Sequence, residues 1–190
     1  MKSRKEKLLS ALHDFLMGFH GSRQALKNDT FLHIRKLLVR DLRGMQREIN
    51  AFPDDASVWE TPPSVSNCAG ILAMHGCGNL NHFIGHVLGG NGYMRDREKE
   101  FSNQGLSRAE ISAEFDRTIA AMESVLPRLD PARLSEPFPL PIAGNTLNTQ
   151  LFLTHLCVHL AFHLGQLGYL RRFQTGDNTS TSPVMPTELV

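Results

Sequence analysis

The sequence predicts an all-α protein built as one helical domain. Apolar residues recur at intervals of three and four along five separate stretches, which is the pattern of amphipathic helices. Prolines and glycines cluster between these stretches, where they favour turns over continued helix. The 190 residues are enough for one domain with a substantial core and too few for two large domains.

The composition argues against several classes of partner. With 20 basic and 19 acidic residues the net charge is +1, so the chain has no general attraction for nucleic acid or anionic membranes. We therefore expect neither as a partner and look for a small-molecule substrate. Three cysteines without a C-x-x-C pair fit a reducing compartment, and we expect a cytoplasmic location.

No membrane or export segment is expected. No window approaches the roughly 20 uninterrupted apolar residues of a membrane-spanning helix. The basic start at Lys2, Arg4, Lys5 and Lys7 is followed by apolar residues, but His13 and Asp14 interrupt the run and no small-residue cleavage site follows. These observations predict a soluble protein that keeps its N-terminal segment.

The first amphipathic stretch predicts an extra helix within residues 1–28. Its apolar positions between Arg4 and Leu26 are Leu8, Leu9, Leu12, Phe15, Leu16 and Phe19. Two roles remain open for this helix, because it can pack on the rest of the domain or offer a contact between subunits.

Residues 29–173 carry the remaining four helices of the predicted domain. The expected helices cover residues 30–49, 67–88, 107–126 and 151–172. Asp29 with Asn28 supplies N-cap chemistry for the first, and Ser107 with Glu110 resembles a capping box for the third. Beyond Phe173, residues 174–190 predict a flexible tail.

The connections between these helices differ in composition. The first contains Trp59 and three prolines, and residues 91–105 are polar and charged. The run Asp96-Arg97-Glu98 predicts a solvated loop with internal ion pairs. Residues 130–148 are too rich in proline for a helix, with an expected turn at Gly144-Asn145.

Three histidines form a stripe on the last helix. His155, His159 and His163 are four residues apart, so their side chains drift by only ~40° per step and climb ~6 Å. One metal ion can take two adjacent rings, but the outer pair stand ~12 Å apart, too far for bonds of about 2 Å. His159 belongs to either possible pair, and spacing alone leaves the choice between His155 and His163 open.

A second polar stripe lies on the helix at residues 67–88. Relative to His75, Asn79, His82 and His86 lie at about +40°, −20° and +20° around the helix axis. We expect this face to meet the stripe on the last helix. Gly76 and Gly78 weaken the helix, which indicates close packing or room left for a site.

Together the two stripes predict a metal site. Neutral imidazole is a common ligand for zinc, nickel and iron, and catalytic sites often combine three protein ligands with an open position. A single histidine would more often be an ordinary hydrogen-bonded residue. Two stripes on separate apolar helices reverse that preference, because burying many imidazoles without a shared function is unfavourable.

The same residues carry a resemblance to a known family. The pattern H-x-x-x-H-x-G-Q at His159, His163, Gly165 and Gln166, together with H-x-x-x-N-L at His75, Asn79 and Leu80, resembles the DinB/YfiT-like superfamily of metalloenzymes. The segment M-H-G-C-G-N-L, followed by R-D-R-E-K-E-F, is similar to an uncharacterised bacterial branch of it. The resemblance covers about residues 30–173 and implies a four-helix bundle in up-down-down-up order.

The resemblance also implies a ligand set. It assigns His75, His159 and His163 to one divalent ion, zinc, nickel or iron, with water completing the shell, and so favours His163 over His155. Asn79 and Gln166 become candidates for contact with the bound cofactor, or for bonds to a neighbouring helix or ligand. His82, His86 and His155 are left as residues behind the ligands, residues facing substrate or packed residues, with direct metal binding as the remaining alternative. Leu164 departs from the family, where a polar or basic residue is common.

Thiol chemistry is the function that the resemblance suggests. Relatives include transferases that join low-molecular-weight thiols, such as bacillithiol, mycothiol or glutathione, to electrophiles. Two alternatives stand beside it. A metal-dependent hydrolase would need a general base, and no acidic residue accompanies the histidine pair as in H-E-x-x-H. The second alternative is a non-enzymatic, dimeric helical bundle that binds metal. For all three functions we expect the protein to be a homodimer.

Cys77 and Cys157 are not expected to react. Cys157 lies about 200° from His159 around its helix, on the far side from the stripe. We interpret both cysteines as small buried apolar residues rather than nucleophiles.

Overall fold

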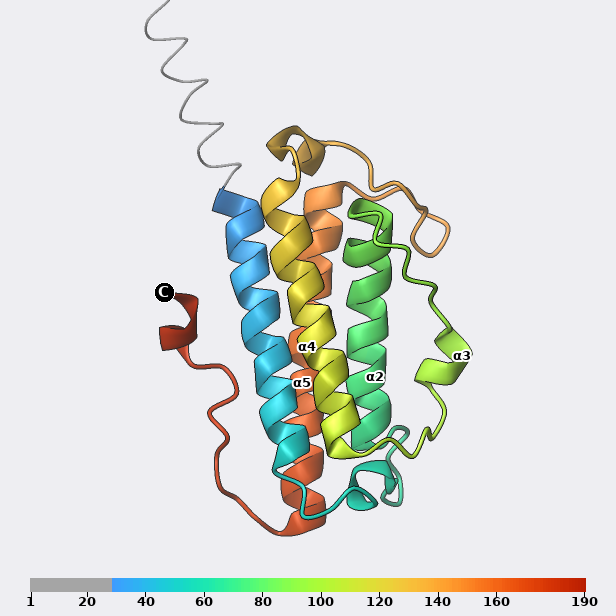
Figure 1. Cartoon of the computed structure of the whole chain (residues 1–190), viewed down its shortest axis with the longest axis vertical. Coiled ribbons are helices and arrows are strands. Elements are labelled where there is room, and N and C mark those ends of the chain that lie inside the picture. Colours follow the sequence, from blue (N-terminus) through green and yellow to red (C-terminus); the bar gives the residue numbers. More distant parts are fainter. Residues whose placement is uncertain (1–28) are drawn as a thin grey trace, which may run out of the picture.

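Four long helices lie side by side along the molecule in the computed structural model, which describes residues 29–190 (Figure 1). The first covers residues 29–50. The others are α2 (Ala69–Leu80), continued by the π-helical segment η2 (Asn81–Leu88), then α4 (Arg108–Val125) and α5 (Thr149–Thr175). The all-α prediction is confirmed for the described residues. The extra helix expected at residues 4–26 lies outside them.

The helices run in up-down-down-up order. Helix 29–50 and α5 begin at one end of the bundle, whereas α2 and α4 begin at the other (Figure 1). Side-chain pairs agree with these directions: Glu48 and Arg171 join the last turns of helix 29–50 and α5. Asn81 donates a hydrogen bond to Thr118 between α2–η2 and the parallel α4.

The helix ends follow the capping residues of the sequence. Ser107 accepts a hydrogen bond from the Glu110 backbone N–H, and the Glu110 side chain accepts one from the Ser107 N–H, so the predicted capping box begins α4. Asn148 caps α5, and Gly176, at φ 67°, ends it in the left-handed conformation that glycine adopts most easily. α5 therefore extends a few residues beyond the predicted range at both ends.

Short helical turns interrupt the connections. They are η1 (Ser57–Trp59), α3 (Arg97–Glu100), η3 (Leu126–Arg128), η4 (Pro131–Ser135) and η5 (Pro186–Leu189). In the proline-rich connection, isolated bridges pair Pro137 with Asn148 and Ile142 with Asn145. The second bridge closes the turn expected at Gly144-Asn145.

The core lies between the four helices. Each contributes fully buried large side chains, among them Leu42, Leu80, Phe115 and Phe152. Burial of such apolar side chains is the main stabilising contribution to a bundle of this kind. The core holds α2 and α5 in antiparallel contact, and His75, His159 and His163 meet where these two helices adjoin.

The C-terminal segment returns along helix 29–50 (Figure 1). Arg171 is completely buried, lies 2.5 Å from the buried Glu48 carboxylate and donates to the backbone carbonyls of Asp177 and Thr179. The structure thus places residues 177–190 against the bundle. The flexibility expected of residues 174–190, like the domain boundary before them, stays a prediction.

α5 has the length and apolar composition of a membrane-crossing helix. This property was not predicted from the sequence for any segment. Its core-facing side is packed in the bundle, and 39% of its most apolar window is buried. Core helices share this property, so it is weak support for a membrane location.

Candidate metal centre

His75, His159 and His163 come together at the junction of α2 and α5. One nitrogen from each ring lies within 4.8 Å of the other two, a separation that suits ligands of one metal ion. The Nε2 atoms of His159 and His163 are 3.1 Å apart. His75 is buried, and the other two rings are half-buried, so the cluster is open on one side.

The spacing on α5 explains why two of its three histidines belong to the cluster. His159 and His163 lie one helical turn apart and both rings meet His75 edge-on, with centroids 5.3 and 5.1 Å away. His155 is exposed, stacks on His159 at 5.7 Å and does not join the group. The structure therefore brings His163, not His155, to His75. Their assignment as ligands remains a prediction.

A buried carboxylate holds His75 from behind. Oε2 of Glu100, on α3, lies 3.0 Å from Nδ1 of His75. Arg95 donates two hydrogen bonds of 2.7 Å to the same carboxylate. A carboxylate on Nδ1 favours the tautomer with a proton on that nitrogen, which leaves the Nε2 lone pair to bind a metal.

Gly78 makes room for this carboxylate. A Cβ atom at position 78 would lie 2.2 Å from Oε1 of Glu100, closer than any real contact. Gly76 faces the side chains of Leu160 and Met45, with a Cβ 3.3 Å or more away. Of the two glycines that the sequence singled out, Gly78 is the one that leaves room for the site.

Gln166 and Asn79 lie close to the cluster on α5 and α2. Nδ1 of His163 donates to Oε1 of Gln166 at 2.7 Å, so Gln166 orients a candidate ligand as Glu100 does for His75. Asn79 is buried, and its Oδ1 has no hydrogen-bond partner among the described residues. A buried acceptor without a partner is unfavourable, so this oxygen is available to a bound ligand.

His82 and His86 do not reach the cluster. Their rings stack on each other at 6.2 Å, and their Nδ1 atoms are buried without a partner among the described residues. The expected common face with His75 assumed α-helical geometry throughout. From Asn81 the helix is π-helical and takes more residues per turn, so each residue advances less around the axis.

The electrostatics of the cluster favour neutral imidazoles. Burial, reinforced by the neighbouring His163 and His75, lowers the pKa of His159 to about 4. Burial also lowers the pKa of His163. Burial alone would raise the pKa of Glu100, but hydrogen bonds from His75 and Arg95 outweigh it and hold this pKa below its ordinary value. At neutral pH the His159 and His163 rings are thus unprotonated, the state that metal binding requires, and a carboxylate lies behind His75.

The cysteines on α2 and α5 are both buried, as expected. Cys77 and Cys157 are buried, and burial raises the pKa of each thiol to about 12. Neither forms a thiolate at neutral pH.

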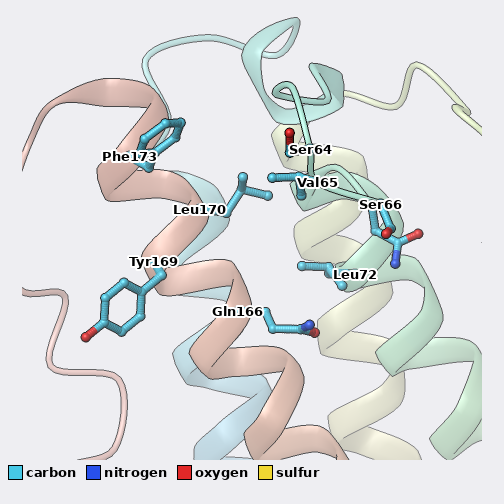
Figure 2. Close-up of a pocket in the computed structure, with 9 residues that line it drawn as sticks. Ser64, Val65, Ser66, Leu72, Gln166, Tyr169, Leu170 and Phe173 are labelled. Carbon is cyan, nitrogen blue, oxygen red and sulfur yellow. The ribbon is translucent and has the colours of Figure 1, made fainter.

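Figure 2 shows a cavity of about 480 Å³, to which the cluster is linked through Gln166, the partner of His163. It is bordered by the start of α2, residues 64–67 and the last three turns of α5. Gln166, whose carbonyl contacts His163, lines the cavity, and its side chain extends toward Leu72 on α2 (Figure 2). The Tyr169 ring points to the other side of α5 (Figure 2).

Sequence reasoning missed Glu100 and Arg95. The neighbouring residues Asp96, Arg97 and Glu98 are exposed, as expected of the charged run. Glu100, two residues later, is buried against His75. No spacing links it to the histidines, because it lies 25 residues from His75 in an irregular connection. Glu100 contacts His75 and neither His159 nor His163, so it does not supply the acidic residue that the pair on α5 lacks in sequence.

The fold and the cluster define the class of the protein: an all-α bundle with a three-histidine site able to hold a metal ion. The chain belongs to the family described as protein of unknown function DUF1572, whose model matches residues 27–186. The match includes most of the C-terminal segment, which lies beyond the range of the resemblance seen in the sequence. Comparisons with curated proteins and with solved structures gave no match.

Proposed function

We propose that this protein is a metalloenzyme of the DinB/YfiT-like superfamily, holding one divalent ion through His75, His159 and His163. The observation that carries the proposal is the convergence of three imidazoles within 4.8 Å, one of them held by a buried carboxylate. The up-down-down-up order of the helices supports the superfamily.

The donor set fits such an ion. Two of the three rings donate from Nδ1 to an oxygen, Glu100 for His75 and Gln166 for His163, so both keep Nε2 for the metal. Three neutral imidazoles suit zinc, nickel or iron. Oδ1 of Asn79, which has no partner among the described residues, would offer an acceptor one helical turn from His75.

We further propose that the reaction is the transfer of a low-molecular-weight thiol to an electrophile. The bound ion would supply the acidity that converts the thiol to a thiolate near neutral pH. In the balanced reaction the thiol proton goes to solvent, sulfur forms a bond to the electrophilic carbon, and the leaving group departs with its electron pair. The protein's part is to hold the reactants and keep the imidazoles neutral.

Thiol transfer is preferred to hydrolysis because of the position of Glu100. A hydrolase needs a free general base beside the bound water. Glu100 is instead engaged by Arg95 and by the far nitrogen of His75. No other acidic residue among those described joins the three histidines.

Metal analysis of untagged protein tests the site. We expect close to one divalent ion per chain, lost in His159→Ala because that ring is central to the cluster. His155→Ala is the matched control and should keep the ion, since the exposed His155 ring only stacks on His159. A metal-free wild type, or loss of metal in His155→Ala alone, contradicts the proposal.

Conjugation of monochlorobimane tests the reaction. With glutathione, bacillithiol and mycothiol assayed separately, at least one thiol should react faster than without protein, and His159→Ala should abolish the increase. Chloride is the leaving group in this assay. No increase with any of the three thiols overturns thiol transfer while leaving the metal site standing.

A further inference from the structure

We propose that the cavity linked to the histidine cluster through Gln166 binds the uncharged, apolar part of the electrophile. This inference rests on the proposed function and names its acceptor class: an aryl or alkyl compound without net charge on the part that enters the protein. The thiol itself would then reach the ion from outside this cavity.

The cavity has the size and lining of a small-molecule site. Its volume of about 480 Å³ falls within the range of roughly 300–1,000 Å³ typical of ligand pockets. Leu72, Leu170 and Val65 give it an apolar interior (Figure 2). Ser64, Ser66 and Asn67 place polar groups along one side, enough to orient a carbonyl or similar group.

Residues on both helices connect the cavity to the metal cluster. On α2, Leu72 lies three residues before His75, about one helical turn. On α5, Gln166 lines the cavity and accepts a hydrogen bond from His163. A molecule in the cavity would therefore lie within about one turn of the ion, close enough for an attached electrophilic carbon to meet a thiolate there.

The absence of charged residues in the lining indicates which of the two substrates the cavity binds. None of the nine residues that line the cavity carries a charge. A carboxylate bound there would lose part of its hydration and find no cation among the lining residues. Thiols such as glutathione carry carboxylates, so the cavity suits the neutral electrophile and not the thiol.

A pair of ligands that differ only in charge tests this inference. The probes are the methyl ester of naphthoic acid and naphthoate, titrated by calorimetry into the full-length protein. Titrations are repeated with His159→Ala, which removes the proposed ion and with it any binding of the carboxylate to metal. We expect the ester to bind at least tenfold more tightly than naphthoate to both proteins.

Substitutions at two positions of equal exposure locate the binding site. Val65 is 39% exposed and points into the cavity (Figure 2), whereas Leu32, 38% exposed, lines a separate cavity beside η3. Val65→Glu should weaken ester binding at least tenfold, and Leu32→Glu should leave it unchanged. Val65→Lys should instead strengthen the binding of naphthoate. Circular dichroism checks that all variants fold.

The outcomes separate this inference from the proposed function. Equal affinity for ester and naphthoate in His159→Ala, or wild-type ester binding by Val65→Glu, overturns the inference. If the ester binds as expected but no thiol reacts, the proposed function fails and the cavity stands as a site for a neutral apolar ligand. If thiol transfer occurs but Val65→Glu leaves the KM for monochlorobimane unchanged, the inference about the cavity fails alone.

Discussion

The geometry of the candidate centre depends on one residue outside the histidine stripes. Glu100 is buried, and its carboxylate is hydrogen-bonded to His75 and Arg95 in the protein interior. Burial of a carboxylate is tolerated only where cations and donors surround it. A residue that fixes the orientation of a metal ligand is expected to influence affinity nearly as much as the ligand itself.

Glu100→Gln should weaken metal binding about 10- to 100-fold, the range for loss of a group that orients a ligand. The amide keeps the shape of the side chain but loses the charge that holds the Nδ1 proton of His75. Gly78→Ala should act in the same direction by displacing Glu100. Competition with a chelating dye for zinc measures both.

Glu98→Gln is the matched control for this prediction. Glu98 lies on the same short helix α3 but is exposed, so its substitution should leave the affinity unchanged. Equal affinity of Glu100→Gln and wild type would show that the carboxylate does not orient a ligand.

At the level of single residues, the sequence predicted which histidines lie together but not the carboxylate that holds one of them. His75, His159 and His163 stand out because helical spacing relates residues on one helix and because two apolar segments carry them. Spacing could not choose between His155 and His163, and that choice came from the resemblance. Glu100 and Arg95 occupy an irregular connection, where no periodicity tells which charged side chain turns inward.

The sequence predicted the helices wherever capping residues and apolar periodicity determine their ends. Helices 29–50, α4 and α5 agree with the expected ranges to within a few residues, because their caps and apolar periods are local signals. The change from α2 to η2 at Asn81 has no such signal in the sequence. Projection at α-helical angles therefore does not apply beyond Asn81, and His82 and His86 do not join the three-histidine group.

The C-terminal segment is an element whose attachment the sequence did not indicate. Thr181 donates to the Glu48 carboxylate that also binds Arg171, and Arg47 donates to the carbonyls of Thr181 and Ser182. The buried side chains of Arg171 on α5 and Glu48 on helix 29–50 are thus hydrogen-bonded directly to the C-terminal segment. The attachment is polar, so an apolar period could not reveal it.

Arg171→Met should destabilise the protein by roughly 3–5 kcal/mol, because it leaves the buried Glu48 carboxylate without its cation. The C-terminal segment would lose two hydrogen bonds to the same guanidinium. Urea unfolding followed by circular dichroism measures the change. Arg133→Met, which removes an exposed pair with Glu136, is the control and should change stability by less than about 0.5 kcal/mol. Equal stabilities of the two variants would contradict the role of Arg171.

On the scale of the whole molecule, α5 presents a long apolar face to solvent. Its large apolar side chains on this face are 59–77% exposed: Leu151, Val158, Phe162, Tyr169 and Phe173. Their spacing of seven and four residues keeps them in one stripe. At sizes of about 150–250 Å² for the aromatic rings, the stripe offers on the order of 500 Å², most of the roughly 800 Å² that each partner buries in a standard interface.

We expect this face to form the predicted homodimer. Sedimentation velocity of the full chain should show a dimer, and Phe162→Glu should convert it to a monomer by placing a charge at the middle of the stripe. Leu32→Glu adds the same charge at an exposed apolar position on helix 29–50 and should remain dimeric. A monomeric wild type would exclude α5 as a subunit interface.

Fold class and helix order were predicted for the molecule as a whole. The helices and their number follow from apolar periods, and the up-down-down-up order followed from the resemblance, since long connections permit more than one order. Homodimerisation and a cytoplasmic location depend on surfaces and on cellular context, which the order of helices does not determine. Both stay predictions.

Different sides of α5 carry different contacts, and an insertion or deletion within this helix would therefore disturb several of them. Along α5, His159 and His163 face α2, Arg171 faces Glu48, and Phe162 faces solvent. Insertion of one residue after His155 would rotate everything that follows by about 100°. The three-histidine cluster, the Arg171–Glu48 pair and the exposed apolar face would all lose their alignment at once. The exposed turn at residues 143–146 carries none of these groups, and we expect insertions to be tolerated better there.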